Sequence, residues 1–197
     1  MKISEIKSEK LNNILKNGGV IGFVTDTVWG IGCLPNSKKG VEKIYKIKHR
    51  DANKPLILMS NDKKNLFKYV KKVPDKAQEL IKKFFPGALT VVLEKSELTG
   101  DFITSGKNTV GIRVPDNKTF SKLCSLIDEK VLATTSANIS GEEPALNFQS
   151  VVDKLSGVVD IIFEDEGENA KGIPSTVVSV LSDEIKILRQ GSVNTNE

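Results

Sequence analysis

Lys48-His49-Arg50-Asp51-Ala52-Asn53-Lys54-Pro55 places three lysine or arginine side chains within seven residues, where a helical pattern ends. The preceding residues 39–48 carry apolar side chains at helical spacing, which predicts an amphipathic helix. Pro55 favours extended geometry at the residue before it, and residues two apart share a face in an extended segment but not in a helix. We therefore expect the chain to unwind here and turn several cations toward one anion, such as a polyphosphate or a carboxylate. The alternative is a solvated, charged helix end.

Arginine is rare in this chain, which makes its positions informative. Of 29 lysine and arginine residues, only Arg50, Arg113 and Arg189 are arginines. A guanidinium is planar and always charged, and it binds carboxylates and phosphates through two parallel hydrogen bonds. These three positions are therefore candidates for anion recognition. Arg113 lies in an apolar strand pattern, so it must meet a carboxylate of the protein or of a ligand, and the sequence leaves both open.

The composition is that of an ordinary globular protein. The chain has 197 residues, 39% hydrophobic and 27% charged, which is enough for one buried core. The net charge of +4 suits anionic small molecules or weak contact with RNA, but it diagnoses neither. Cys33 and Cys124 lack the spacing of a zinc site or of a secreted disulfide framework. No signal-peptide or membrane-spanning pattern is present, so we expect a cytoplasmic protein without a membrane partner.

Alternating apolar runs and helical patterns predict a fold of the α/β class. The predicted helices cover residues 3–16, 39–48, 62–70, 75–85, 117–127 and 147–155. The predicted strands cover residues 20–24, 55–59, 88–93, 110–115, 131–135 and 158–163, followed by a hairpin of 176–181 and 184–188 around Ser182-Asp183. Residues 94–108 and 164–175 are expected to be long loops, which are often functional. Because no repeat or linker interrupts the pattern, we expect a single domain over residues 1–197.

Two stretches place small polar side chains at predicted strand ends. One is Thr25-Asp26-Thr27-Val28-Trp29-Gly30-Ile31-Gly32, and the other is Thr134-Thr135-Ser136-Ala137-Asn138-Ile139-Ser140. Hydroxyls and close backbone approach at strand ends are a common setting for a ligand. The alternatives are a polar turn with Trp29 in the core, and hydroxyls that only cap helices or satisfy turns.

Several well-known catalytic motifs are missing, and this narrows the chemistry. His49 is the only histidine, and the sequence contains no GxSxG elbow, phosphate-binding GxxxxGK[ST] loop, HExxH or GxGxxG motif. The remaining candidate is a site made of cations and hydroxyls. Such a site suits reactions in which gathering anions and stabilising phosphoryl charge supply most of the catalysis.

Six pieces of the sequence resemble, in order, the YrdC/Sua5 family, and together they cover nearly the whole chain. They are Thr25-Asp-Thr-Val-Trp-Gly-Ile-Gly, Lys48-His-Arg with Lys54-Pro-Leu, Pro86-Gly with Thr90, Val110-Gly-Ile-Arg-Val-Pro, Ser136-Ala-Asn with Ser140-Gly, and Pro174-Ser-Thr-Val-Val. The resemblance implies an open, twisted, mixed sheet flanked by helices, with a concave basic face. It also implies a threonylcarbamoyl-AMP synthase of the short form. Such an enzyme uses L-threonine, bicarbonate and ATP with Mg²⁺, and releases pyrophosphate, toward N6-threonylcarbamoyladenosine in tRNA.

The same resemblance implies two groups of ligand-binding residues. The threonine group is Thr27, Arg113, Ser136 and Ser175, with Arg113 on the carboxylate. The ATP group is Lys48, Arg50, Lys54, Thr134, Asn138 and Arg189, of which Lys48 and Arg50 are also expected to be catalytic. No protein side chain is expected to ligate the metal. The chain departs from the family pattern at Val24, where Pro is usual, at Trp29, where Tyr or Phe is usual, and at Met59, where many members have His.

Two rival functions remain open at the level of sequence. One is a non-catalytic RNA-binding module like YciO, whose concave basic face would hold tRNA or double-stranded RNA. The other is a related ATP-dependent carbamoyl-transfer enzyme. Few aromatic residues lie among the cations, whereas RNA modules stack bases on such rings, and this favours the synthase. The expected partners of a synthase are a downstream threonylcarbamoyl-transferase complex and tRNA. Whether residues 164–172 form a lid is left open.

Overall fold

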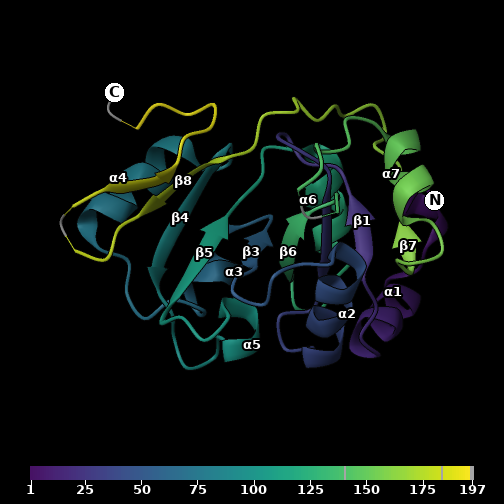
Figure 1. Ribbon diagram of the computed structural model, residues 1–197, viewed down its shortest axis with the longest axis horizontal. Helices are drawn as coiled ribbons and strands as arrows, with labels where there is room; N and C mark the ends of the chain where they lie inside the picture. Colours follow the sequence, from purple (N-terminus) through teal and green to yellow (C-terminus); the bar gives the residue numbers. More distant parts are fainter. Residues whose placement is uncertain (140, 183, 196–197) are drawn as a thin grey trace.

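Nine strands form one mixed sheet in the computed structural model, which describes residues 1–139, 141–182 and 184–195 (Figure 1). The strands are β1 (Ile21–Phe23), β2 (Gly30–Cys33), β3 (Ile57–Ser60), β4 (Leu89–Glu94), β5 (Thr109–Arg113), β6 (Val131–Ser136), β7 (Ile161–Ile162), β8 (Thr176–Ser179) and β9 (Lys186–Arg189). Their order across the sheet is β7-β1-β2-β6-β3-β5-β4-β8-β9. The pairs β1–β7, β3–β5 and β4–β8 are parallel, and the other pairs are antiparallel. The expected open, mixed α/β sheet is therefore confirmed.

Helices cover both faces of this sheet. They are α1 (Ser8–Lys16), α2 (Lys38–Lys48), α3 (Lys63–Phe67), α4 (Asp75–Phe84), α5 (Asp101–Thr104), α6 (Lys118–Ser125) and α7 (Phe148–Leu155), with a short 3-10 helix at Ile3–Glu5. Several begin where a side chain accepts a backbone N–H of the first turn, as Ser37 does before α2 and Asn117 before α6. In α2 the apolar side chains recur on one face, so burying that face against the sheet stabilises the helix.

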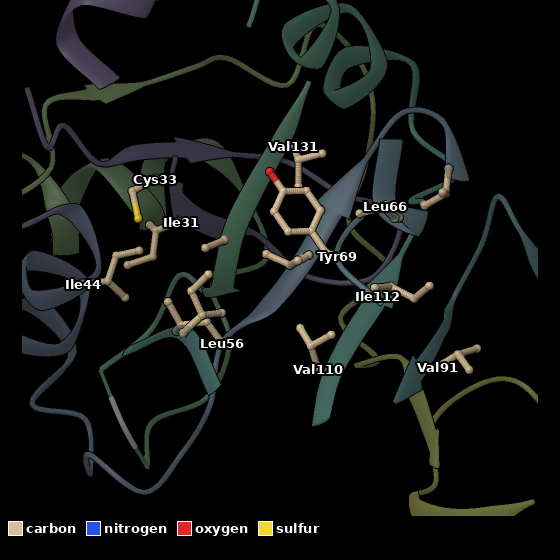
Figure 2. Close-up of a cluster of buried hydrophobic side chains, with 14 of the residues drawn as sticks. Ile31, Cys33, Ile44, Leu56, Leu66, Tyr69, Val91, Val110, Ile112 and Val131 are labelled. Carbon is tan, nitrogen blue, oxygen red and sulfur yellow. The ribbon is translucent and has the colours of Figure 1, made fainter. Parts of the chain in front are cut away.

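The core consists of two clusters of buried apolar side chains, one on each face of the sheet. Helices α2, α3, α4 and α7 pack in the larger cluster, part of which Figure 2 shows from Ile31 and Cys33 of β2 to Val91 of β4. Helices α1 and α6 contribute to the smaller cluster, where Phe23 of β1 meets Phe120 of α6. Neighbouring strand residues alternate between the clusters, as the pleat of a strand requires. Strands β3 and β6 thus contribute side chains to both clusters, whereas the edge strand β9 is exposed along its whole length.

One strand was not anticipated from the sequence. The stretch 25–32 was expected to form the polar end of the strand 20–24, but Gly30–Cys33 is a separate strand, β2, antiparallel to both β1 and β6. Glycine normally weakens a strand, so the two glycines at positions 30 and 32 did not indicate one. Here the absence of a side chain is required, since a Cβ at Gly30 would lie 2.9 Å from the Phe23 ring and one at Gly32 would lie 3.1 Å from Thr134.

Other differences are smaller. The expected loop 94–108 contains helix α5, and the expected strand 158–163 is reduced to the two residues of β7. The expected hairpin is present as β8 and β9, although Asp183 in its turn and Ser140 of the second polar stretch lie outside the described residues. Within residues 1–139, 141–182 and 184–195, no helix combines the length and the apolar character that crossing a bilayer requires.

Candidate active site

A cavity of about 360 Å³ lies against several strands of the sheet and the loops that adjoin their ends. Eight of the ten ligand-binding residues expected from the sequence line it: Thr27, Arg50, Arg113, Thr134, Ser136, Asn138, Ser175 and Arg189. Trp29 and Met59, two of the departures from the family pattern, also line the cavity, together with Pro144 and Pro174. Distant segments of the sequence therefore converge on one hollow with cationic, hydroxyl and apolar walls.

Arg113 is the most deeply buried cation of this cavity. Its Nε donates to Gly87 O at 2.9 Å, Nη1 donates to Thr27 Oγ1 at 2.7 Å, and Nη2 donates to Asp26 Oδ1 at 2.5 Å. The sequence left open whether Arg113 meets a protein carboxylate, and the structure shows that it does. A guanidinium has five N–H donors, so these bonds leave one N–H on each terminal nitrogen, the number that a bidentate carboxylate takes. Burial lowers the pKa of Arg113 most strongly, and Asp26 opposes that shift.

The turn that carries Asp26 and Thr27 is fixed by its own hydrogen bonds. Thr25 Oγ1 accepts from the backbone N–H of Thr27 at 3.2 Å and lies 2.6 Å from Val28 O, to which it donates. Both threonine side chains are buried. The position of Thr27 Oγ1, and with it one contact of Arg113, is therefore set by the local sequence Thr-Asp-Thr.

Ser175 is held from two sides. Its Oγ lies 2.8 Å from Thr90 Oγ1 of β4. From β9, Arg189 donates to Ser175 O through Nε at 3.1 Å and through Nη2 at 2.8 Å. Arg189 was expected to contact ATP, but in this structure its guanidinium also fixes the backbone beside Ser175. Close packing of Gly191 against residues 174–176 completes this wall.

Arg50 forms another part of the cavity wall. Its side chain is half-buried, and it closes its own loop by donating from Nε to Lys54 O and from Nη2 to Pro55 O, both at 3.0 Å. Tyr45 of α2 also acts on this guanidinium through a side-chain hydrogen bond. The side chain of Lys54 is exposed and does not line the cavity, so only its backbone carbonyl takes part in this arrangement. Burial lowers the pKa of Arg50 from its ordinary value.

Lys48 lies behind the cavity wall rather than in it. The side chain is 1% exposed, and its Nζ donates to Ser136 O at 2.5 Å, to Asn138 O and, at 3.3 Å, to Asn138 Oδ1. The next residue, His49, adopts the left-handed conformation with φ 46° and ends α2. The chain therefore changes direction between Lys48 and Arg50. Of the two cations that were expected to face one ligand, only Arg50 lines the cavity. Burial, with nearby Arg50, lowers the pKa of Lys48 to about 8.

The described part of the second polar stretch lines the cavity with Thr134, Thr135, Ser136 and Asn138. Ser136 ends β6, and Asn138 is fixed by a bond from its Nδ2 to Glu142 O at 2.6 Å as well as by Lys48. Thr134 Oγ1 lies 3.3 Å from Ile57 O across the β3–β6 pair. These side chains therefore serve both as turn-forming groups and as lining of the cavity.

The residue that sequence reasoning missed is Asp26. It lay inside the quoted Thr25–Gly32 stretch, but only the fold brings it to Arg113, 87 residues away. Among the described residues, no group of three or more His, Cys, Asp or Glu side chains is arranged to hold a metal ion. The charged groups at the cavity are mainly arginines, so the site is suited to anionic ligands.

Comparison with known proteins gives consistent results. The family model Sua5_yciO_yrdC, described as "Telomere recombination", matches residues 13–191. Threonylcarbamoyl-AMP synthase of Pyrococcus abyssi (strain GE5 / Orsay) is 34% identical over 196 residues, which cover 100% of this chain and 57% of that protein. Putative threonylcarbamoyl-AMP synthase of Methanocaldococcus jannaschii is 34% identical over 200 residues, which cover 98% of this chain and 93% of that protein.

A solved structure extends the likeness to three dimensions. P. abyssi Sua5 complexed with L-threonine matches with a TM-score of 0.86 and 32% identity, over 93% of this chain and 54% of that chain. The chain therefore spans little more than half of the P. abyssi protein, but nearly all of the M. jannaschii protein.

Proposed function

The chain belongs to the Sua5/YciO/YrdC family, and from this premise we propose that it is a threonylcarbamoyl-AMP synthase. The substrates are L-threonine, bicarbonate and ATP, and the products are threonylcarbamoyl-AMP and pyrophosphate. The observation that carries the proposal is Arg113, a buried arginine at the cavity that keeps one N–H on each terminal nitrogen for a carboxylate. Arg50 lines the same cavity and supplies a cation for phosphates.

The proposed reaction has two steps, and neither needs a side-chain nucleophile. The amine nitrogen of threonine bonds to the carbon of bicarbonate and water leaves, which gives a carbamate. A carbamate oxygen then attacks the α-phosphorus of ATP, and the bond from that phosphorus to the pyrophosphate oxygen breaks. Positioning both substrates and stabilising phosphoryl charge supply most of the catalysis in such a transfer.

The cavity walls suggest how the substrates divide between the residues. We assign the threonine carboxylate to Arg113, with Thr27, Ser136 and Ser175 around the amino acid. Arg50, Thr134, Asn138 and Arg189 are assigned to ATP, and Lys48 acts on ATP indirectly because its ammonium holds the backbone of residues 136–138. The described cavity lining is cationic and hydroxylic, so Mg²⁺ would be held by the ATP phosphates and would neutralise part of their charge.

The rival functions fit this cavity less well. A non-catalytic RNA module would need an open face with stacking aromatics, whereas Arg113 lies deep in a small hollow. A related ATP-dependent carbamoyl-transfer enzyme would differ from the synthase in its acceptor, and the substrate test below separates these two functions.

Threonylcarbamoyl-AMP is a reactive mixed anhydride, so we propose that a downstream threonylcarbamoyl-transferase complex consumes it to modify tRNA.

Pyrophosphate release should require threonine and bicarbonate together with ATP. Serine should be a slower substrate, because it lacks the methyl group that an apolar wall such as Pro144 or Pro174 can contact. A pocket of this kind discriminates by about 1 to 3 kcal/mol per methyl group, so serine turnover should be reduced but measurable. The measurement is pyrophosphate release with each substrate omitted in turn. ATP turnover that is indifferent to the amino acid would refute the proposed function.

Replacing Arg50 with alanine should lower kcat/KM for ATP about 100-fold, the usual loss when one preorganised charge-stabilising donor is removed. Threonine binding should change little, because the backbone acceptors of Arg50, Lys54 O and Pro55 O, are separate from the acceptors of Arg113. Steady-state kinetics with ATP varied, and calorimetry with threonine, measure the two effects. Lys46→Ala, which removes an exposed cation on α2, is the matched control. An equal loss in both variants would mean that only the net charge matters.

A further inference from the structure

Asp26 is the one carboxylate that contacts Arg113 in the described part of the chain. Its Oδ1 accepts from Nη2 at 2.5 Å, and the two side chains are 10% and 2% exposed, respectively. An uncompensated guanidinium at such a depth would be costly, because burial disfavours an unpaired charge. The other two acceptors of Arg113 are a carbonyl and a hydroxyl, both neutral. Asp26 therefore supplies the charge-assisted contact that fixes one arm of the guanidinium.

Hydrogen bonds hold the backbone around Asp26 from two directions. The Thr25 hydroxyl fixes the turn from within, as described above. From the loop that ends at Ser175, the N–H of Lys171 donates to Asp26 O at 3.4 Å and that of Gly172 donates to Thr27 O at 2.7 Å. The carboxylate thus projects from an immobilised turn. A group held in this way can orient its partner, which is what preorganisation of a binding site requires.

Asp26 also lowers the net positive charge at this end of the cavity. Arg189 lines the same cavity as Arg113, and repulsion between the two cations lowers the pKa of Arg113. Arg113, Arg189 and Asp26 together carry a net charge of +1. A single further carboxylate neutralises that charge, whereas two arginines without Asp26 would favour a dianion.

We propose that Asp26 is the positioning residue of the amino-acid subsite: it orients the free N–H groups of Arg113 toward a monocarboxylate and limits the positive charge there. This inference rests on the proposed function. Asp26 does not act on the reacting atoms itself. Its contribution passes through Arg113, and this distinguishes it from a residue that only stabilises the fold.

The test compares Asp26→Ala, which removes the acceptor and the charge, with Asp26→Asn, which keeps the size and an oxygen acceptor. Threonine dissociation constants and KM values should rise about 10-fold in the alanine variant and about 3-fold in the asparagine variant. ATP binding should stay within about twofold in both. Calorimetry with threonine and with ATP, separately, gives these values. Asp160→Asn is the matched control, since Asp160 pairs with Lys43 outside the cavity and its loss should leave threonine affinity unchanged.

A double variant tests the route of the effect. If Asp26 acts through Arg113, then adding Asp26→Ala to Arg113→Lys should weaken threonine binding no further than Arg113→Lys alone. Additive losses would overturn the inference, and so would unchanged or tighter threonine binding in Asp26→Ala. A lowered melting temperature with normal threonine affinity would show a purely structural role and also overturn it. If the wild-type protein binds no threonine, the proposed function fails, and this inference fails with it.

Discussion

Threonine should bind about 10- to 100-fold more weakly to Arg113→Lys, while ATP affinity should stay within about twofold. Lysine keeps the positive charge but has three N–H donors instead of five, so it cannot keep the bonds to Gly87, Thr27 and Asp26 and also donate twice to a ligand carboxylate. Hydrogen bonds to charged groups contribute about 1.5 to 3 kcal/mol, which corresponds to this range of affinity. Calorimetry with each ligand measures the two constants, and pyrophosphate release at saturating threonine shows how much activity returns.

Arg113 has protein partners, and therefore the competing explanation is that it serves the fold alone. In that case Arg113→Lys would melt earlier, but threonine would still raise its melting temperature as much as in the wild-type protein. Thermal melts with threonine and with ATP titrated separately distinguish the two explanations. A wild-type shift with both ligands would place the threonine carboxylate elsewhere.

Local patterns predicted most of the fold because its elements are locally encoded. Helix α2 carries its apolar residues on one face and ends at Lys48, as the pattern over residues 39–48 indicated; the structure adds Ser37 as its N-cap. Strand β4 is a nearly continuous apolar run that is mostly buried in the sheet, and β6 begins with the buried apolar residues Val131, Leu132 and Ala133. Strand β2 was missed because its glycines are needed only in the folded protein, where Phe23 and Thr134 leave no room for a side chain at these positions.

The site was predictable as a set of residues but not as an arrangement. The three arginines were found because arginine is rare in the sequence, and the family resemblance added hydroxyl residues and Asn138. Eight of these ten predicted residues line one cavity. Lys48 could not be told apart from a ligand-contacting cation, since its carbonyl partners at Ser136 and Asn138 lie 88 and 90 residues away. Asp26 was overlooked for the same reason. An acidic side chain between two threonines shows no sign of its partner until the sheet brings β5 beside the turn.

Gly191→Ala should weaken threonine binding at least 10-fold although residue 191 lies outside the cavity lining. A Cβ at this position would lie 2.5 Å from Thr176 N and 2.6 Å from Ser175 C, much closer than packed atoms approach. These neighbours are backbone atoms, so the strain cannot be relieved by rotating a side chain. The segment 189–193 must move away, and this separates Arg189 from Ser175 and breaks the bond from Gly191 N to Thr176 Oγ1.

The expected loss of stability from such overpacking is about 1 to 3 kcal/mol, which a urea or thermal melt measures. Gly22→Ala is the matched control, because a Cβ at Gly22 of β1 would meet Ile162 at 3.5 to 3.8 Å, an ordinary contact distance. Threonine affinity should therefore be unchanged in Gly22→Ala and reduced in Gly191→Ala, with both measured below their melting temperatures. If Gly191→Ala binds threonine normally, Ser175 does not contribute to the amino-acid subsite. If ATP affinity alone falls, Arg189 belongs to the phosphate end of the cavity and Ser175 should be assigned there as well.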